Sequence, residues 1–141
     1  STPLYSSAAS DVYKRQHVHS SSIVELPNGD LLSCWFQGSG ERKANDVKIM
    51  GSRLKKGTKK WEEPFMMSDT PGFPDCNPVL FLNQRKELFL FWIVIKSNKW
   101  EETIIKYKKS HIINLLPLFY SLRKGLVILY AKHLTLYTMN R

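Results

Sequence analysis

The chain is poor in cysteine and has no long apolar run. Its 141 residues include two cysteines, Cys34 and Cys76, and none of its residues show metal-ligand spacing. We therefore expect neither a metal nor a cofactor, and we expect both thiols to be buried in strands. The first residues lack the apolar core of a signal peptide. Pro117 and Arg123-Lys124-Gly125 interrupt the apolar runs near the end, so none reaches the roughly 20 residues that span a bilayer. We expect no membrane partner.

Acidic residues are missing from the last part of the chain. The net charge of +9 and the pI near 9.6 are typical of nucleic-acid-binding proteins. However, residues 17–102 carry 12 Lys and Arg against 11 Asp and Glu, a net charge of +1, whereas residues 103–141 carry 7 Lys and Arg and no acid. Because the basic charge is concentrated in a tail, we predict no nucleic-acid partner.

The chain does contain an internal repeat. The segment IVELPNGDLLSCW (Ile23–Trp35) returns as VLFLNQRKELFLFW (Val79–Trp92), which pairs Leu26 with Leu82 and Trp35 with Trp92 at offsets of 56 and 57 residues. This period is slightly longer than the roughly 40 to 50 residues of common β-propeller repeats. It predicts propeller blades, which cannot bury their own faces alone.

Alternating apolar residues and turn signals predict strands from Ser20 onward. The first turn is predicted at Pro27–Asp30, with Pro71–Pro74 as the connection to the second unit. The expected strands are 23–26, 31–36, 46–54, one opened by Trp61, one starting near Pro78, 87–95 and 101–108.

The sequence divides into three regions. Residues 1–16 have no strand or helix period and resemble translated sequencing-adapter text found at the starts of metagenomic gene fragments, so we interpret them as an artefact or a disordered tail. Residues 17–110 are predicted to form a partial β-propeller of two blades. Residues 111–141 break the repeat, and a frameshift or misread end would explain the joint loss of acids, Trp and period. A native outer strand is the alternative.

Four ordered motifs carry a resemblance to a known family. They are HSSSIVELPNGDLLSCWF from His19, GSGERKANDVKI ending at Ile49, WEEP from Trp61 and NPVLF from Asn77. Together they resemble the sialidase (neuraminidase) superfamily, more closely its bacterial BNR-repeat branch of sialidase-like glycosyl hydrolases, over residues 19 to about 109. The resemblance implies an all-β fold in which the chain forms the first two blades of a six-bladed β-propeller, flanked by N- and C-terminal tails outside the propeller. The missing downstream blades would then be partners of this chain.

A degraded hairpin signature accompanies these motifs. The text SRLKKGTKKW (Ser52–Trp61) is similar to the Asp-box of that family, although its spacing is two residues too long and the Asp is absent. The resemblance implies a structural role, in which Gly57 supplies the turn and Trp61 packs between neighbouring sheets. An ordinary Lys-rich hairpin is the alternative.

The resemblance also implies a glycosidase that removes terminal sugars, sialic acid among them, from a glycan substrate. Such an enzyme needs a carboxyl group that protonates the leaving oxygen. Asp46, at the mouth of a strand, is the first candidate, and Glu41, in a glycine-flanked loop, is the second. Solvated loop acids are the alternative for both.

The other site candidates are substrate-binding residues. The family binds the substrate carboxylate with arginines, because a planar guanidinium matches a carboxylate with two bonds. Where the first arginine is expected, this chain has His17-Val18-His19, so His19 is the candidate there, together with Arg42 and Asn77. The family's tyrosine nucleophile belongs to later blades, which makes the site incomplete. The alternative function is a non-catalytic propeller that binds carbohydrate or protein.

Overall fold

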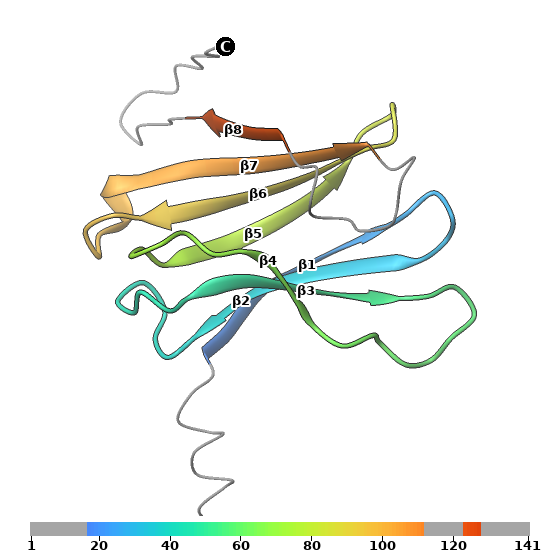
Figure 1. The fold of residues 1–141 in the computed structure, drawn as a ribbon, viewed down its shortest axis with the longest axis horizontal. Helices are drawn as coiled ribbons and strands as arrows, with labels where there is room; N and C mark the ends of the chain where they lie inside the picture. Colours follow the sequence, from blue (N-terminus) through green and yellow to red (C-terminus); the bar gives the residue numbers. More distant parts are fainter. Residues whose placement is uncertain (1–16, 112–122, 128–141) are drawn as a thin grey trace, which may run out of the picture.

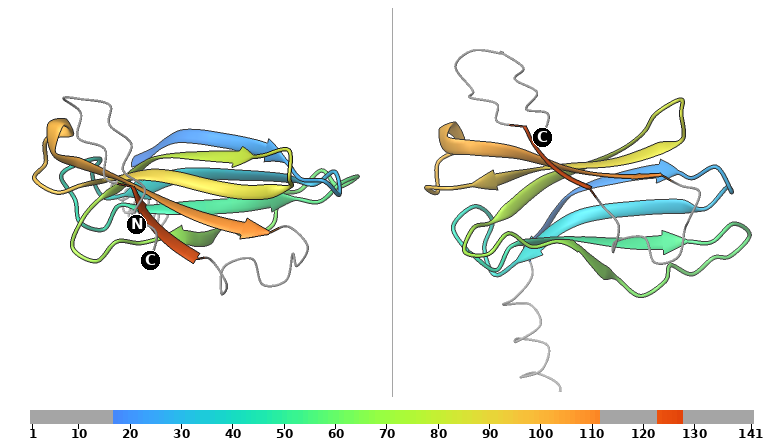
Figure 2. Two further views of the ribbon diagram at one scale, coloured as in Figure 1. Left: turned by 90° about the horizontal axis from the view of Figure 1, so that it is seen from above. Right: turned by 45° about the horizontal axis from the view of Figure 1, so that its top comes forward.

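The chain folds into two antiparallel β-sheets. The computed structural model describes residues 17–111 and 123–127. Sheet A contains β1 (His17–Glu25), β2 (Leu31–Gly38), β3 (Lys48–Leu54) and β4 (Phe65–Ser68) in chain order. Sheet B contains β5 (Asp75–Leu82), β6 (Glu87–Ile95), β7 (Thr103–His111) and β8 (Arg123–Val127), with one 3-10 turn, η1 (Trp100–Glu102), between β6 and β7. The two sheets lie one above the other (Figures 1 and 2), which confirms the predicted all-β class.

Several predicted boundaries differ from the structure. Trp61 was predicted to open the outer strand of the first unit, but that strand begins only at Phe65. A proline at position 64, which cannot donate a ladder hydrogen bond, directly precedes it. In the second unit, β8 pairs with β7 as the fourth strand, the arrangement that the outer-strand alternative described. Residues 1–16, 112–122 and 128–141 lie outside the described residues, so the origin of the two tails stays a prediction.

A buried aspartate fixes the first hairpin. Asp30 is only 5% exposed, and its carboxylate accepts hydrogen bonds from the Lys56 backbone N–H at 2.7 Å, from Arg53 Nε at 2.7 Å and from Asn28 Nδ2 at 2.8 Å. The Lys56 N–H and then the Arg53 guanidinium lower the pKa of Asp30 to about 2, because both favour the charged form. Asp30 therefore ties the start of β2 to the end of β3.

The second sheet has an equivalent ion pair, formed by different residues. Glu87 occupies the position 57 residues after Asp30, and it forms an ion pair with Lys109, which lies 56 residues after Arg53. The backbone repeats as well, since Gly29 and Lys86, again 57 residues apart, both have positive φ, at 84° and 59°. The repeat is thus conformational and electrostatic as well as apolar.

The strand register defines which residues are equivalent. In sheet A, Ser22 pairs with Cys34 after an irregularity that follows His19, and in sheet B Val79 pairs with Phe91 after an irregularity that follows Cys76. Each of these positions differs from its counterpart by 57 residues, and the same offset relates Trp35 to Trp92, as predicted. The predicted pairing of Leu26 with Leu82 is wrong by one residue. Leu26 N donates to Asp30 O just as Asn83 N donates to Glu87 O, so the counterpart of Leu26 is Asn83.

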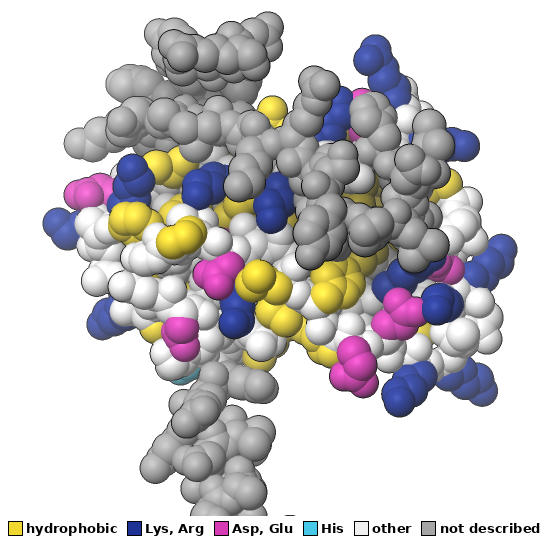
Figure 3. Space-filling view, viewed as in Figure 1, with side chains coloured by type: hydrophobic (Ala, Val, Ile, Leu, Met, Phe, Trp, Pro, Cys, Tyr) yellow, Lys and Arg dark blue, Asp and Glu magenta, His cyan; other side chains and the backbone are white. Residues whose placement is uncertain are grey.

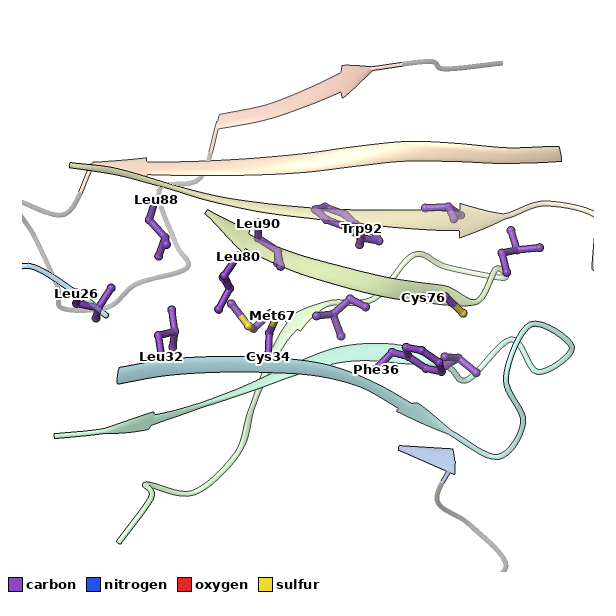
Figure 4. Close-up of a cluster of buried hydrophobic side chains, with 14 residues drawn as sticks. Leu26, Leu32, Cys34, Phe36, Met67, Cys76, Leu80, Leu88, Leu90 and Trp92 are labelled. Carbon is purple, nitrogen blue, oxygen red and sulfur yellow. The ribbon is translucent and has the colours of Figure 1, made fainter. Parts of the chain in front are cut away.

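The hydrophobic core lies between the two sheets (Figure 4). Alternate residues of β2 and of β6 point into it, as the period of two for a half-buried strand requires. A fully buried leucine or phenylalanine contributes about 1.5–3 kcal/mol relative to an exposed one. The labelled members of the cluster are Leu26, Leu32, Cys34, Phe36, Met67, Cys76, Leu80, Leu88, Leu90 and Trp92. Both thiols are buried, as expected, and burial raises the pKa of each to about 12.

The two sheets pack head to tail. We call the face of each sheet that is turned toward the other its inner face, and the opposite face its outer face. Trp92 is 4% exposed on the inner face of sheet B, whereas its counterpart Trp35, next to the buried Cys34 and Phe36, lies on the outer face of sheet A. A two-fold arrangement would place both tryptophans in one interface. The observed packing instead matches the stacking of successive blades, in which equivalent faces point the same way.

Within the described ranges, no helix is long and apolar enough to cross a membrane. Figure 3 shows one face of the molecule, where hydrophobic side chains gather near the centre and charged side chains of both signs are dispersed around them.

Candidate functional site

The candidate residues meet at one end of the two sheets. His17, at the start of β1, pairs with Gly38, at the end of β2, so the β2–β3 loop (39–47) lies at this end. The start of β5 lies there too, because the Asp75 N–H donates to Val47 O at 3.0 Å. The fold therefore brings the loop acids together with the beginnings of β1 and β5, the first strand of each sheet.

Asp46 closes the β2–β3 loop on itself. Its carboxylate accepts hydrogen bonds from the Ser39 backbone N–H at 3.1 Å and from Ser39 Oγ at 2.8 Å. A Cβ on Gly38 would lie 2.7 Å from Val47 Cα, so only glycine allows the two ends of the loop to come this close. Asp46 is exposed, but its hydrogen-bond partner Ser39 belongs to the same loop.

Glu41 lies on the same loop. Its side chain is exposed. Burial raises the pKa of the Cys76 thiol first, and the negative charge of Glu41 raises it further. Among the described residues no hydrogen bond or ion pair of Glu41 is found. Its carboxylate is thus available to a ligand at this end of the sheets.

Arg42 links the loop to the second sheet. Its guanidinium lies over the Trp100 ring, 5.8 Å from the ring centroid. Such a cation–π contact contributes about 0.5–1 kcal/mol at an exposed site. The contact holds the β2–β3 loop against η1.

His19 lies in β1 and Asn77 lies in β5, the first strands of the two sheets. The His19 ring stacks on Phe36 with centroids 5.5 Å apart and on His17 at 5.9 Å, while its edge stays exposed. Asn77 has a positive φ of 48°, and its Oδ1 accepts a hydrogen bond from Ser20 Oγ at 3.2 Å. Ser20, 57 residues earlier, has the matching φ of 52°. These two left-handed residues join the strand starts.

Sequence reasoning missed a buried carboxyl beside this end. Asp75 is 0% exposed, and desolvation raises the pKa of its carboxyl, although Thr70, Trp92, Lys106 and Ser68 act in the opposite direction. Neither carboxyl oxygen forms a hydrogen bond of normal geometry within the described chain, and the same holds for Trp92 Nε1. Lys106 Nζ donates instead to Thr70 Oγ1 at 3.0 Å. The available signal was an acid at the first position of a mostly apolar strand.

A shallow hollow lies elsewhere, on the outer face of sheet A. It measures about 440 Å³ and is lined by Trp35, Trp61, Ser33, Ser52, Glu62, Glu63 and Pro64. Gly57 has a φ of 79° and supplies the predicted turn, and Ser52 Oγ donates to Glu62 O at 2.6 Å. Trp61 was expected to pack between neighbouring sheets, but it does not lie between sheets A and B. It remains 38% exposed, because no described element covers the outer face.

Within the described part of the chain, no three His, Cys, Asp or Glu side chains are grouped closely enough to hold a metal ion. The side chains described at this end are carboxylates, imidazoles, an amide and a guanidinium.

Comparison with known families agrees with this geometry. Residues 29–112, more than half of the chain, match the model of the BNR repeat-like domain. No curated protein matches the chain. The matched range begins in the first hairpin and ends just past β7, so it includes the β2–β3 loop and the second hairpin and leaves out β1. BNR repeats are the sialidase-type β-propeller repeat, found in sialidase-like glycosidases. The chain belongs to the BNR repeat-like domain family.

Proposed function

We propose that this chain supplies part of the active site of a sialidase-like exo-glycosidase, which hydrolyses terminal sugars of glycans. The observation that carries the proposal is the convergence of Glu41, Asp46, His19 and Asn77 at one end of two BNR-type sheets. Propellers carry their ligands at the ends of the blades, close to the innermost strands. The site residues lie at such an end, beside β1 and β5.

The contacts favour different roles for the two loop acids. Asp46 accepts hydrogen bonds from Ser39 and so positions the loop. Glu41 is exposed, has no hydrogen bond or ion pair among the described residues, and is our proposed proton donor to the leaving oxygen. This reverses the order expected from the sequence, where Asp46 came first, and the sequence-based assignment remains the competing hypothesis.

The substrate-binding groups favour a sugar that carries hydroxyl groups at the recognised position. His19 and Asn77 can each donate and accept hydrogen bonds. Arg42, the arginine nearest to the site residues in sequence, lies over Trp100. We therefore propose that the chain binds a neutral part of the glycan. A nucleophile and carboxylate-binding arginines would come from further blades of a longer protein.

A second function has one observation in its favour. Because imidazoles replace the family's first arginine and Arg42 is engaged with an aromatic ring, a non-catalytic propeller that binds carbohydrate or protein fits the same site. The two functions differ in turnover, so one experiment can separate them.

The test uses the longest reading frame that contains this sequence. Glu41→Gln, Asp46→Asn and the control Glu25→Gln, an exposed glutamate at the far end of β1, are assayed on glycosides with poor and with activated aryl leaving groups. If Glu41 is the proton donor, Glu41→Gln lowers turnover of the poor substrate by about a hundred- to ten-thousand-fold and harms the activated substrate far less.

Three other outcomes contradict parts of the proposal. If Asp46→Asn shows that selective loss and Glu41→Gln does not, Asp46 is the donor. If the unsubstituted protein of the longest reading frame binds glycans on an array but hydrolyses none of the glycosides, the non-catalytic function is correct. If it neither binds nor hydrolyses glycans, the site is not a carbohydrate site.

A further inference from the structure

The first strands of the two sheets contain the same β-bulge. In β1, Ser20 and the residue after it together oppose Trp35 of β2, and in β5 Asn77 and the residue after it together oppose Trp92 of β6. The first residue of each bulge is left-handed, with a φ of 52° at Ser20 and 48° at Asn77. A bulge bends its strand and re-aims a side chain, and bulges are frequent beside active sites.

Ser20 is an unusual residue for this backbone conformation. Glycine adopts it most readily, because it has no Cβ, and asparagine tolerates it better than most other residues. Non-glycine residues with positive φ cluster at binding and catalytic sites, where the side chain has a role that outweighs the strain. The contact of Ser20 is a hydrogen bond from its Oγ to Asn77 Oδ1 at 3.2 Å, between two exposed side chains.

This hydrogen bond determines how the Asn77 amide is oriented. A side-chain amide has one acceptor oxygen and one NH2 group with two donor hydrogens. Because Oδ1 accepts from Ser20, Nδ2 is turned away from that bond, and it has no hydrogen-bond partner among the described residues. Asn77 therefore presents N–H donors, and not its oxygen, to a ligand at this end of the sheets.

The backbone around Asn77 is held independently of this bond. Two residues before it, the Asp75 N–H donates to Val47 O at 3.0 Å, next to the loop that carries the candidate acids. Three residues after it, the Leu80 N–H donates to Ser22 Oγ at 3.0 Å. The strand is thus fixed on both sides of Asn77, whereas the orientation of the amide depends on the bond between the two side chains.

We propose that Ser20 is a positioning residue of the glycan site, which fixes the Asn77 amide so that Nδ2 donates hydrogen bonds to an acceptor oxygen of the sugar. This role rests on the proposed function and adds the direction of one hydrogen bond. Carbonyl, carboxylate and hydroxyl oxygens all accept such a bond. Of these groups, only a hydroxyl also donates when the protein group opposite is an acceptor.

Ser20→Gly and Asn77→Asp separate the hydrogen bond from backbone strain. Glycine adopts the left-handed conformation more readily than serine, so Ser20→Gly removes the hydroxyl without adding strain. Aspartate is also tolerated in that conformation and still accepts from Ser20, but it has no N–H donor. Ser22→Ala is the matched control, because it removes the other hydroxyl that joins β1 to β5.

The experiment uses the protein of the longest reading frame that contains this sequence. It is titrated with the methyl glycosides of galactose, N-acetylglucosamine and N-acetylneuraminic acid, and NMR chemical-shift changes measure the binding. These sugars offer hydroxyl groups alone, hydroxyl groups with a carbonyl, and both with a carboxylate. Three-bond couplings across the Cα–Cβ bond of Asn77 show, without any sugar, whether the side chain has one rotamer.

The unsubstituted protein should show one Asn77 rotamer, and Ser20→Gly should show an average of several. Ser20→Gly should weaken sugar binding by about three- to tenfold, whereas Ser22→Ala leaves it unchanged. Asn77→Asp should weaken binding through a carbonyl or carboxylate by about ten- to a hundredfold, and binding through a hydroxyl by at most about threefold. In the Asn77→Asp background, Ser20→Gly should add no further loss, because Ser20 acts through the amide.

Several rotamers of Asn77 in the unsubstituted protein would refute the role of Ser20, even if the sugars bind. Losses that add up in the double variant would show that Ser20 contacts the sugar itself. Equal losses in Ser20→Gly and Ser22→Ala would reduce both serines to structural links between the strands. If Asn77 has one rotamer but none of the three sugars binds, the proposed function fails, and the sugar as the acceptor fails with it.

Discussion

Trp92 and Trp35 provide a direct test of the head-to-tail packing within the chain. They occupy equivalent positions 57 residues apart, but Trp92 is 4% exposed between the sheets, whereas Trp35 is only half-buried on an uncovered face. Truncation of a buried Trp to Ala costs about 3–5 kcal/mol through lost transfer free energy and the remaining cavity. For Trp35→Ala we expect a loss of about 1–2 kcal/mol, since much of the ring is already in water.

A milder variant separates packing from hydrogen bonding. Trp92 Nε1 is buried without a hydrogen-bond partner in the described residues. A buried donor without a partner costs about 1–3 kcal/mol. Trp92→Phe keeps a ring and removes that donor, so its net cost should stay below about 1.5 kcal/mol.

The assay is urea unfolding followed by far-UV circular dichroism. The free energies come from linear extrapolation, and unchanged m-values would show that the unfolded state is unaltered. Equal losses for Trp35→Ala and Trp92→Ala would refute the reasoning, because a symmetric arrangement would bury both rings.

Three further predictions follow from the buried polar groups. The Asp30 pKa is lowered to about 2, so its stabilisation is complete above its unfolded value of about 3.9 and is lost as pH falls toward 2. Asp30→Asn should therefore flatten the acid limb of a stability–pH curve, and an unchanged acid limb would contradict this. Asp75 has a raised pKa, so its contribution has the opposite sign, and stability falls as pH rises above its unfolded value. The stability of Asp75→Asn relative to the unsubstituted chain should therefore be higher at neutral pH than at pH 4. If the variant instead loses more stability at neutral pH than at pH 4, the carboxylate is stabilised by Lys106. Cys34 and Cys76 are buried with pKa values raised to about 12, so thiol labelling should require unfolding, and rapid labelling of the native protein would count against the core described here.

Parts of the candidate site were predictable from the sequence. Asp46 and Glu41 could be assigned to one loop because a strand ends before it and another begins after it. The same reasoning could not rank them, since the difference lies in contacts: Asp46 is held by Ser39, and Glu41 has no hydrogen bond or ion pair among the described residues. Asp75 escaped notice because its burial depends on the packing of the two sheets against each other.

The sequence alone determined the strands, the hairpins and the repeat. Alternating apolar residues, the Pro27–Asp30 turn and the return of the pattern in β6 are local signals, and hydrogen bonding within each sheet follows them. Only the tertiary structure decided which face of each sheet is covered. Ser33 and Gln37 lie on the same face of β2 as Trp35, but β6 is apolar on both faces, so the sequence around Trp92 does not show which face is covered. What distinguishes the two tryptophans is that sheet B stacks head to tail on sheet A, which takes water from one tryptophan and leaves it on the other.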